Sequence, residues 1–151
     1  MNEVLAGSKV VDGKFSLELP SEVSDEMLTA WYNTTLFMTH DRYYVKANPE
    51  ELRLTQIEFT TDAGMFSIGT FRECGIPGDV RKGDVTMVYF FYADRNARIS
   101  GNVMSVFGTS TERDVCLAKG WNMIVVRHNN KGLHYTITYV AEPMPENAIW
   151  R

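Results

Sequence analysis

Residues 116–140 have the sequence CLAKGWNMIVVRHNNKGLHYTITYV, in which two apolar runs flank a short polar segment. Asn129 at the first turn position and Gly132 at the fourth favour a type I turn closed by a glycine bulge. This turn predicts a β-hairpin in which His128 pairs with His134. The same register predicts one apolar face along the hairpin, made of Trp121, Met123, Val125, Ile137 and Tyr139.

The hairpin begins at a polar corner, Lys119-Gly120, which is followed by Trp121 and Asn122. Gly120 permits the bend, and Trp121 is the first large residue expected to enter the core. Asn122 is expected to point the other way, where its amide can bond backbone groups that the bend leaves unpaired. The Trp-Asn pair is therefore predicted to shape the corner and to pack, and not to form a site.

Strand and turn patterns continue along most of the chain. Asp12-Gly13 is typical of a type I′ turn, and residues 85–92 are apolar on both alternating faces, which predicts a central strand. A helix of one or two turns is expected after Ser24, which could cap it. The pattern predicts an all-β fold, namely an antiparallel β-sandwich of the Ig-like or Greek-key type with at most one short helix. The same pattern predicts a single domain over residues 1–151, with a core that includes Phe15, Leu17, Tyr89, Phe91, Trp121, Val125 and Ile137.

The composition limits the classes of function. A net charge of −4 argues against a basic nucleic-acid-binding surface. No run of about 18 apolar residues is present, and the N-terminal residues lack the basic region of a signal peptide. Cys74 and Cys116 could form one disulfide in an exported chain or remain separate thiols in the cytosol, and the sequence leaves both options open.

Four short motifs occur in a fixed order: GKFSLELP at residues 13–20, ISG at 99–101, LAKGWN at 117–122 and PENAIW at 145–150. In this order they resemble a group of uncharacterised secreted lipoprotein domains of Bacteroidetes. The resemblance implies a β-sandwich, export, and a periplasmic or outer-membrane-anchored location at the cell surface. It implies no catalytic or binding residue. The printed sequence shows neither the signal peptide nor the lipid-acceptor cysteine of that pattern, so export is an expectation from the resemblance, and contact with a membrane is expected only through a lipid anchor outside this sequence.

Two groups of residues are candidates for binding. His128 and His134 could together hold Zn²⁺ or Cu²⁺, but a third ligand is missing nearby, so we expect no metal and no cofactor. Aromatic rings beside polar groups can stack on sugar rings. The candidate ligand-binding residues of this kind are Trp31, Tyr32, Tyr43 and Tyr44.

The sequence contains none of the catalytic motifs G-x-S-x-G or H-E-x-x-H, and no phosphate-binding glycine loop. We therefore expect a non-catalytic module at the cell surface, one that binds a protein or a glycan or spaces other domains. One alternative is a carbohydrate-binding module that uses the aromatic residues above. Another is a small hydrolase whose site the motifs do not reveal. No nucleic-acid partner is expected.

Overall fold

The computed structural model describes residues 4–34, 44–61, 64–66, 68–70, 85–104, 109–131, 134–141 and 149–150. Strands dominate these residues, and the helical elements among them are two short 3₁₀ turns. The elements are η1 (Asp25–Met27), β1 (Thr29–Ala30), η2 (Trp31–Asn33), β2 (Val45–Asn48), β3 (Arg53–Ile57), β4 (Phe59–Thr61), β5 (Gly64–Phe66), β6 (Ile68–Thr70), β7 (Val85–Ala93), β8 (Ala97–Met104), β9 (Thr109–Leu117), β10 (Gly120–Lys131), β11 (His134–Val140) and β12 (Ile149–Trp150).

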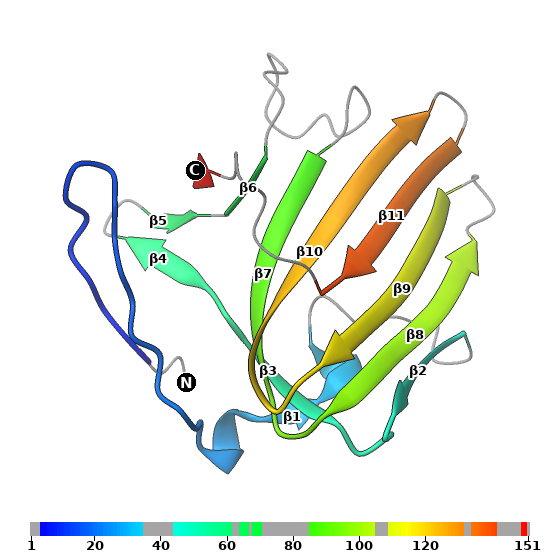
Figure 1. Cartoon of the computed structure of the whole chain (residues 1–151), viewed down its shortest axis with the longest axis horizontal. Helices are drawn as coiled ribbons and strands as arrows, with labels where there is room; N and C mark the ends of the chain where they lie inside the picture. The colour runs from blue at the N-terminus through cyan, green and yellow to red at the C-terminus, as the bar shows by residue number, and fades with distance from the viewer. Residues whose placement is uncertain are drawn as a thin grey trace.

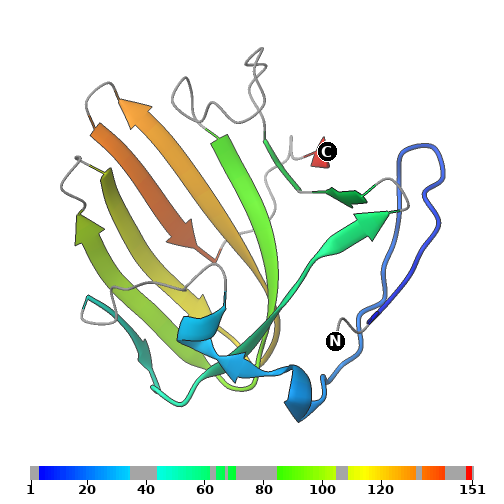
Figure 2. The same cartoon turned by 180° about the vertical axis from the view of Figure 1, so that it is seen from behind.

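The strands form one large sheet in the order β1-β3-β7-β10-β11-β9-β8-β2. Strand β6 also pairs with β7 and carries β12, while β4 and β5 form a separate two-stranded ribbon. The neighbours are antiparallel except for β11 and β9, which run parallel. Figures 1 and 2 show the sheet curled into a half-barrel from opposite sides.

The predicted all-β class is confirmed. The predicted pair of packed sheets is not, because all the described strands except β4 and β5 belong to one curled sheet, whose curvature encloses the core. The helix expected after Ser24 is reduced to the 3₁₀ turn η1. Ser24 lies at its N-cap position, but the serine side chain makes no capping hydrogen bond. No helix in the described part of the chain is long and apolar enough to cross a membrane.

The main core lies on the concave face of the half-barrel. On β8 and β9 the side chains alternate, so that Ile99 and Val115, which are paired across the two strands, are both fully buried. Trp31 from η2 and Leu52, the residue before β3, also belong to this core. The remaining buried members are Val45, Ala47, Leu54, Phe91, Ala93, Leu117, Ile124, Val126 and Tyr139.

Strand β7 is central, as predicted, and buries side chains on both of its faces. On the face opposite the main core, Tyr92 makes an edge-to-face contact with Trp121 at 5.3 Å between ring centroids. Trp121 in turn donates a hydrogen bond from Nε1 to the carbonyl oxygen of Pro20 at 2.7 Å. The ring centroids of Phe15 and Phe59 are 6.3 Å apart, so the N-terminal segment packs against β4, which lies beside it in Figure 1.

This second packing layer corrects part of the predicted core. Phe91 and Val125 are fully buried as expected, but they lie on opposite faces of the sheet. Phe15, Leu17, Tyr89, Trp121 and Ile137 are only partly buried. Trp121 does not enter the main core, because the alternation of β10 assigns that face to Ile124 and Val126.

Two turn predictions are confirmed. Asp12 and Gly13 adopt φ angles of 50° and 73°, as a type I′ turn requires, and Val11 and Lys14 exchange two hydrogen bonds of 2.9 Å. At the second corner, the amide of Asn122 bonds three backbone groups. Its Oδ1 accepts from the N–H of Ala118 at 2.9 Å, and its Nδ2 donates to the carbonyl oxygens of Ala118 and Gly120 at 2.8 Å each.

The predicted register of the β10–β11 hairpin is wrong. Lys131 pairs with His134, so His128 lies opposite Ile137 and not opposite His134. Only two residues separate the paired strands, fewer than expected, so the ladder extends to Lys131. Each residue of β10 is therefore paired three positions further along β11 than predicted; Val125, for example, lies opposite Val140 and not Ile137. An odd shift exchanges the faces, so Ile137 packs against the main core that contains Val126.

Candidate functional site

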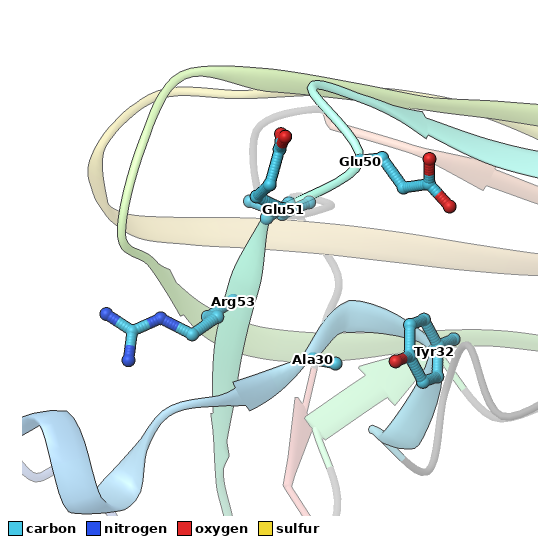
Figure 3. A pocket seen from close by; sticks show the side chains of 6 residues that line it. Ala30, Tyr32, Glu50, Glu51 and Arg53 are labelled. Carbon is cyan, nitrogen blue, oxygen red and sulfur yellow. The ribbon is translucent and has the colours of Figure 1, made fainter.

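An open hollow of about 230 Å³ lies where η2 and β1 meet the start of β3. Its walls come from two short segments that β1–β3 pairing holds together. The lining residues are Ala30, Tyr32, Glu50, Glu51, Leu52 and Arg53 (Figure 3).

Backbone hydrogen bonds fix the two walls relative to each other. Ala30 pairs with Arg53 in the β1–β3 ladder, and the N–H of Trp31 donates to the carbonyl oxygen of Leu52 at 3.1 Å. A turn before Leu52 presents Glu50 and Glu51 to solvent, where both side chains are exposed. The hollow therefore places two carboxylates beside one aromatic ring on a backbone held by the sheet.

The ring in the hollow is Tyr32. It contacts Trp31 edge-to-face, with 5.7 Å between the ring centroids and 80° between the ring planes. Tyr32 is half-buried, whereas Trp31 is only 4% exposed and belongs to the main core. The buried indole thus supports the tyrosine ring from behind and leaves part of it accessible.

The positive charge near the hollow is already paired. Figure 3 shows the guanidinium of Arg53 directed away from Glu50 and Glu51. Its Nη2 donates to Asp25 at 2.9 Å, and its Nε and backbone N–H donate to Asp94 at 3.4 and 3.0 Å. Arg53 is held by these two acids, so the hollow offers its carboxylates to a ligand. Glu51 is also near Arg95, whose pKa is raised first by its hydrogen bond to Asp94 and further by Glu51, so Glu50 is the carboxylate farther from a positive charge.

Asp94 is the anchor of this ion-pair group. Its side chain is 9% exposed, and it also accepts a 2.9 Å bond from Nη2 of Arg95. Burial by itself raises the pKa of Asp94, but the hydrogen bonds from Arg95 and from the backbone of Arg53 outweigh it, so the pKa of Asp94 is lowered. Asp94 therefore stays ionised and holds the start of β3 against the end of β7.

The structure describes three of the four predicted aromatic binding residues and separates them. Tyr32 lines the hollow, and Trp31 is buried beneath it, so Trp31 offers no exposed stacking face. Tyr44 is 65% exposed just before β2 and does not line the hollow. Tyr43 lies outside the described residues. Glu50 and Glu51 were missed, since single acids in a turn carry no motif.

The histidine pair is not assembled by the hairpin, as the corrected register shows. His128 is half-buried, and burial lowers the pKa of its imidazole. Within the described ranges no group of three potential metal-ligating side chains comes together. Cys116 is exposed on β9, and Cys74 lies outside the described residues.

A polar group that sequence reasoning also missed lies on the concave face. Arg113 on β9 is only 7% exposed, and its guanidinium Cζ is 4.7 Å from the ring centroid of Tyr139. Burial and, to a lesser extent, the nearby Tyr139 raise the pKa of Tyr89. The alternation of residues 109–117 could have located Arg113, because it is in phase with the buried Val115 and Leu117.

Comparison with protein-family models, curated proteins and solved structures finds no match to this chain. The candidate sites are therefore defined by geometry alone: the hollow beside Tyr32 and the concave face around Arg113.

Proposed function

We propose that this chain is a non-catalytic binding module that takes a glycan in the hollow beside Tyr32. The observation that carries the proposal is the combination of a supported, half-accessible tyrosine ring with two exposed carboxylates in one hollow. The C–H face of a sugar ring packs on an aromatic ring, and its hydroxyls donate to carboxylates. Export to the cell surface is part of the same proposal and is supported by the resemblance to secreted lipoprotein domains.

The charge of the hollow selects among glycans. Glu50 and Glu51 are exposed, while the nearby guanidinium of Arg53 is engaged by Asp25 and Asp94. Uronic acids and sulfated sugars would be repelled by the two carboxylates. Neutral sugars and amino sugars are therefore the expected ligands.

The size of the hollow implies weak binding at each site. One sugar unit of roughly 12 non-hydrogen atoms at ~0.3 kcal/mol per atom gives about 3.6 kcal/mol, which corresponds to a Kd in the millimolar range. Useful retention on a polysaccharide then requires several modules or several repeats of the ligand. Arrays and affinity gels that present many copies of a glycan are the appropriate assays.

The test is affinity electrophoresis against neutral, amino and acidic polysaccharides, followed by variants. Tyr32→Ala and the double variant Glu50→Gln with Glu51→Gln should each abolish the retardation caused by the bound glycan. Tyr44→Ala is the matched control, because Tyr44 is an exposed tyrosine outside the hollow. The proposal fails if no glycan retards the protein, or if Tyr44→Ala weakens retention as much as Tyr32→Ala. Release of reducing sugars would contradict the non-catalytic assignment.

A further inference from the structure

Within the part of the chain that the structure describes, Arg113 is buried without an acidic partner, whereas three other arginines form ion pairs. Arg53, Arg95 and Arg98 each bind an aspartate, at 2.9 Å, 2.9 Å and 2.7 Å. Arg113 is 7% exposed, yet its Nε and Nη1 have no hydrogen-bond partner among the described residues. A buried guanidinium without acceptors is costly, and proteins usually compensate such a group with an anion.

The acids nearest to Arg113 in sequence cannot supply that anion. Glu112 and Asp114 are its direct neighbours on β9, so they project from the opposite face of the sheet and are exposed. Asp114 is also held by Arg98, at 2.7 and 2.8 Å. The local sequence thus points the cation inward and both anions outward.

The concave surroundings of Arg113 are defined by the register. Tyr139 lies directly opposite on β11, and its ring faces the guanidinium at 4.7 Å. Gly101 lies opposite on β8, and Val115 follows two residues later on the same face of β9. Ile137, two residues before Tyr139, packs against the same core. Among the described residues, the side chains that the register places around Arg113 on this face include the ring of Tyr139 and the aliphatic groups of Val115 and Ile137.

From this arrangement we propose that Arg113 is the anion-binding residue of an interior site for an organic carboxylate that carries an apolar group. The unpaired N–H groups of Nε and Nη1 donate to the carboxylate oxygens, since guanidinium and carboxylate form short charge-assisted hydrogen bonds. The apolar part of the ligand lies against side chains such as Ile137 and Val103, which are only partly buried. Tyr139 holds the guanidinium plane by cation–π contact and so orients its N–H edges.

This site is separate from the glycan hollow, because none of the residues that line the hollow lies on β9 or β11. The test therefore compares the melting temperature of the purified chain with and without benzoate, hexanoate, acetate and inorganic phosphate. Benzoate and hexanoate should raise the melting temperature of the wild type, and the rise should grow with ligand concentration. Acetate and phosphate should raise it less, because neither carries an apolar group of comparable size. Tyr32→Ala should respond as the wild type does.

Arg113→Met is the decisive variant. Without ligand it should melt at or above the wild-type temperature, because methionine removes a buried unpaired charge and keeps much of the volume. It should also lose the response to benzoate, with a Kd at least tenfold higher by calorimetry, while Arg113→Lys should retain a reduced response. The proposal is overturned if Arg113→Met melts far below the wild type without ligand, since Arg113 would then have a partner within the chain. It is also overturned if the wild type shows no response, or if phosphate acts as strongly as benzoate.

Discussion

Asn122→Ala should destabilise the chain by about 1–2 kcal/mol. The side chain makes three hydrogen bonds, to the N–H and carbonyl of Ala118 and to the carbonyl of Gly120, at 2.8–2.9 Å. Each such bond contributes ~0.5–1.5 kcal/mol net, so a fully buried set of three would give up to about 4.5 kcal/mol. Ala118 is exposed, so water replaces part of what the variant loses, and the lower figure follows.

Urea unfolding followed by tryptophan fluorescence measures this loss, provided that the slope of the transition does not change. Asn102→Ala is the matched control, because Asn102 is exposed on β8 and accepts one 3.2 Å bond from the hydroxyl of Ser110. We expect the control to change stability by less than about 0.5 kcal/mol. Equal effects of the two substitutions would refute the conclusion that Asn122 organises the corner between β9 and β10.

Three further predictions concern stability. Trp121→Ala should cost about 2–3 kcal/mol in the same urea assay, less than a fully buried tryptophan, because the indole is half-buried; a loss below 1 kcal/mol would mean that the N-terminal segment does not pack on it. Gly101→Ala should lower the melting temperature by several degrees, because an added Cβ would overlap the carbonyl oxygen of Tyr44; an unchanged melting temperature would contradict this close approach of β2 to β8. Burial raises the pKa of Asp94, but the hydrogen bonds from Arg95 and from the backbone of Arg53 lower it by more, so the folded-state pKa is below the unfolded value of about 3.9. The ionised side chain therefore stabilises the fold above that unfolded pKa, and this stabilisation is lost as the pH falls through the lower folded value. The wild type should therefore lose stability more steeply than Asp94→Asn below about pH 4, and parallel acid-unfolding curves would exclude this ion-pair group as a source of stability.

Local sequence signals predicted local structure well. Asp12-Gly13 defined its turn because few residue pairs tolerate positive φ at both positions. Asn122 could be assigned to the corner because a short amide beside a glycine has backbone groups within reach. Strand β7 could be assigned to a central position because it is apolar on both faces.

Long-range pairing could not be predicted in the same way. The sequence does not show that β11 pairs in parallel with β9, and this contact is part of what joins the strands into one curled sheet instead of two layers. The register of the β10–β11 hairpin depended on a turn length that Asn129 and Gly132 suggested incorrectly. The ladder continues to Lys131, and the error placed Ile137 on the wrong face.

The candidate sites were predicted only in part. Trp31 and Tyr32 are adjacent in sequence, and only the tertiary packing shows that one supports the core while the other lines a hollow. Glu50 and Glu51 become notable only when β1 pairs with β3 beside them. The alternation of β9 places Arg113 on the same face as Val115 and Leu117. An arginine in a strand is usually exposed, however, so the sequence alone does not show that this one is buried.

The binding of a glycan beside Tyr32 is tested most directly by chemical-shift mapping. A ¹⁵N-labelled sample would be titrated with neutral and amino-sugar oligosaccharides that retard the protein in gels. We expect the shifted amides to cluster at residues 30–33 and 50–53, the two segments that line or flank the hollow, with a millimolar Kd and no comparable shifts at Tyr44 or along β9. Shifts that centre on Tyr44, on β9 or on any other surface would contradict it, as would an unchanged spectrum at saturating oligosaccharide.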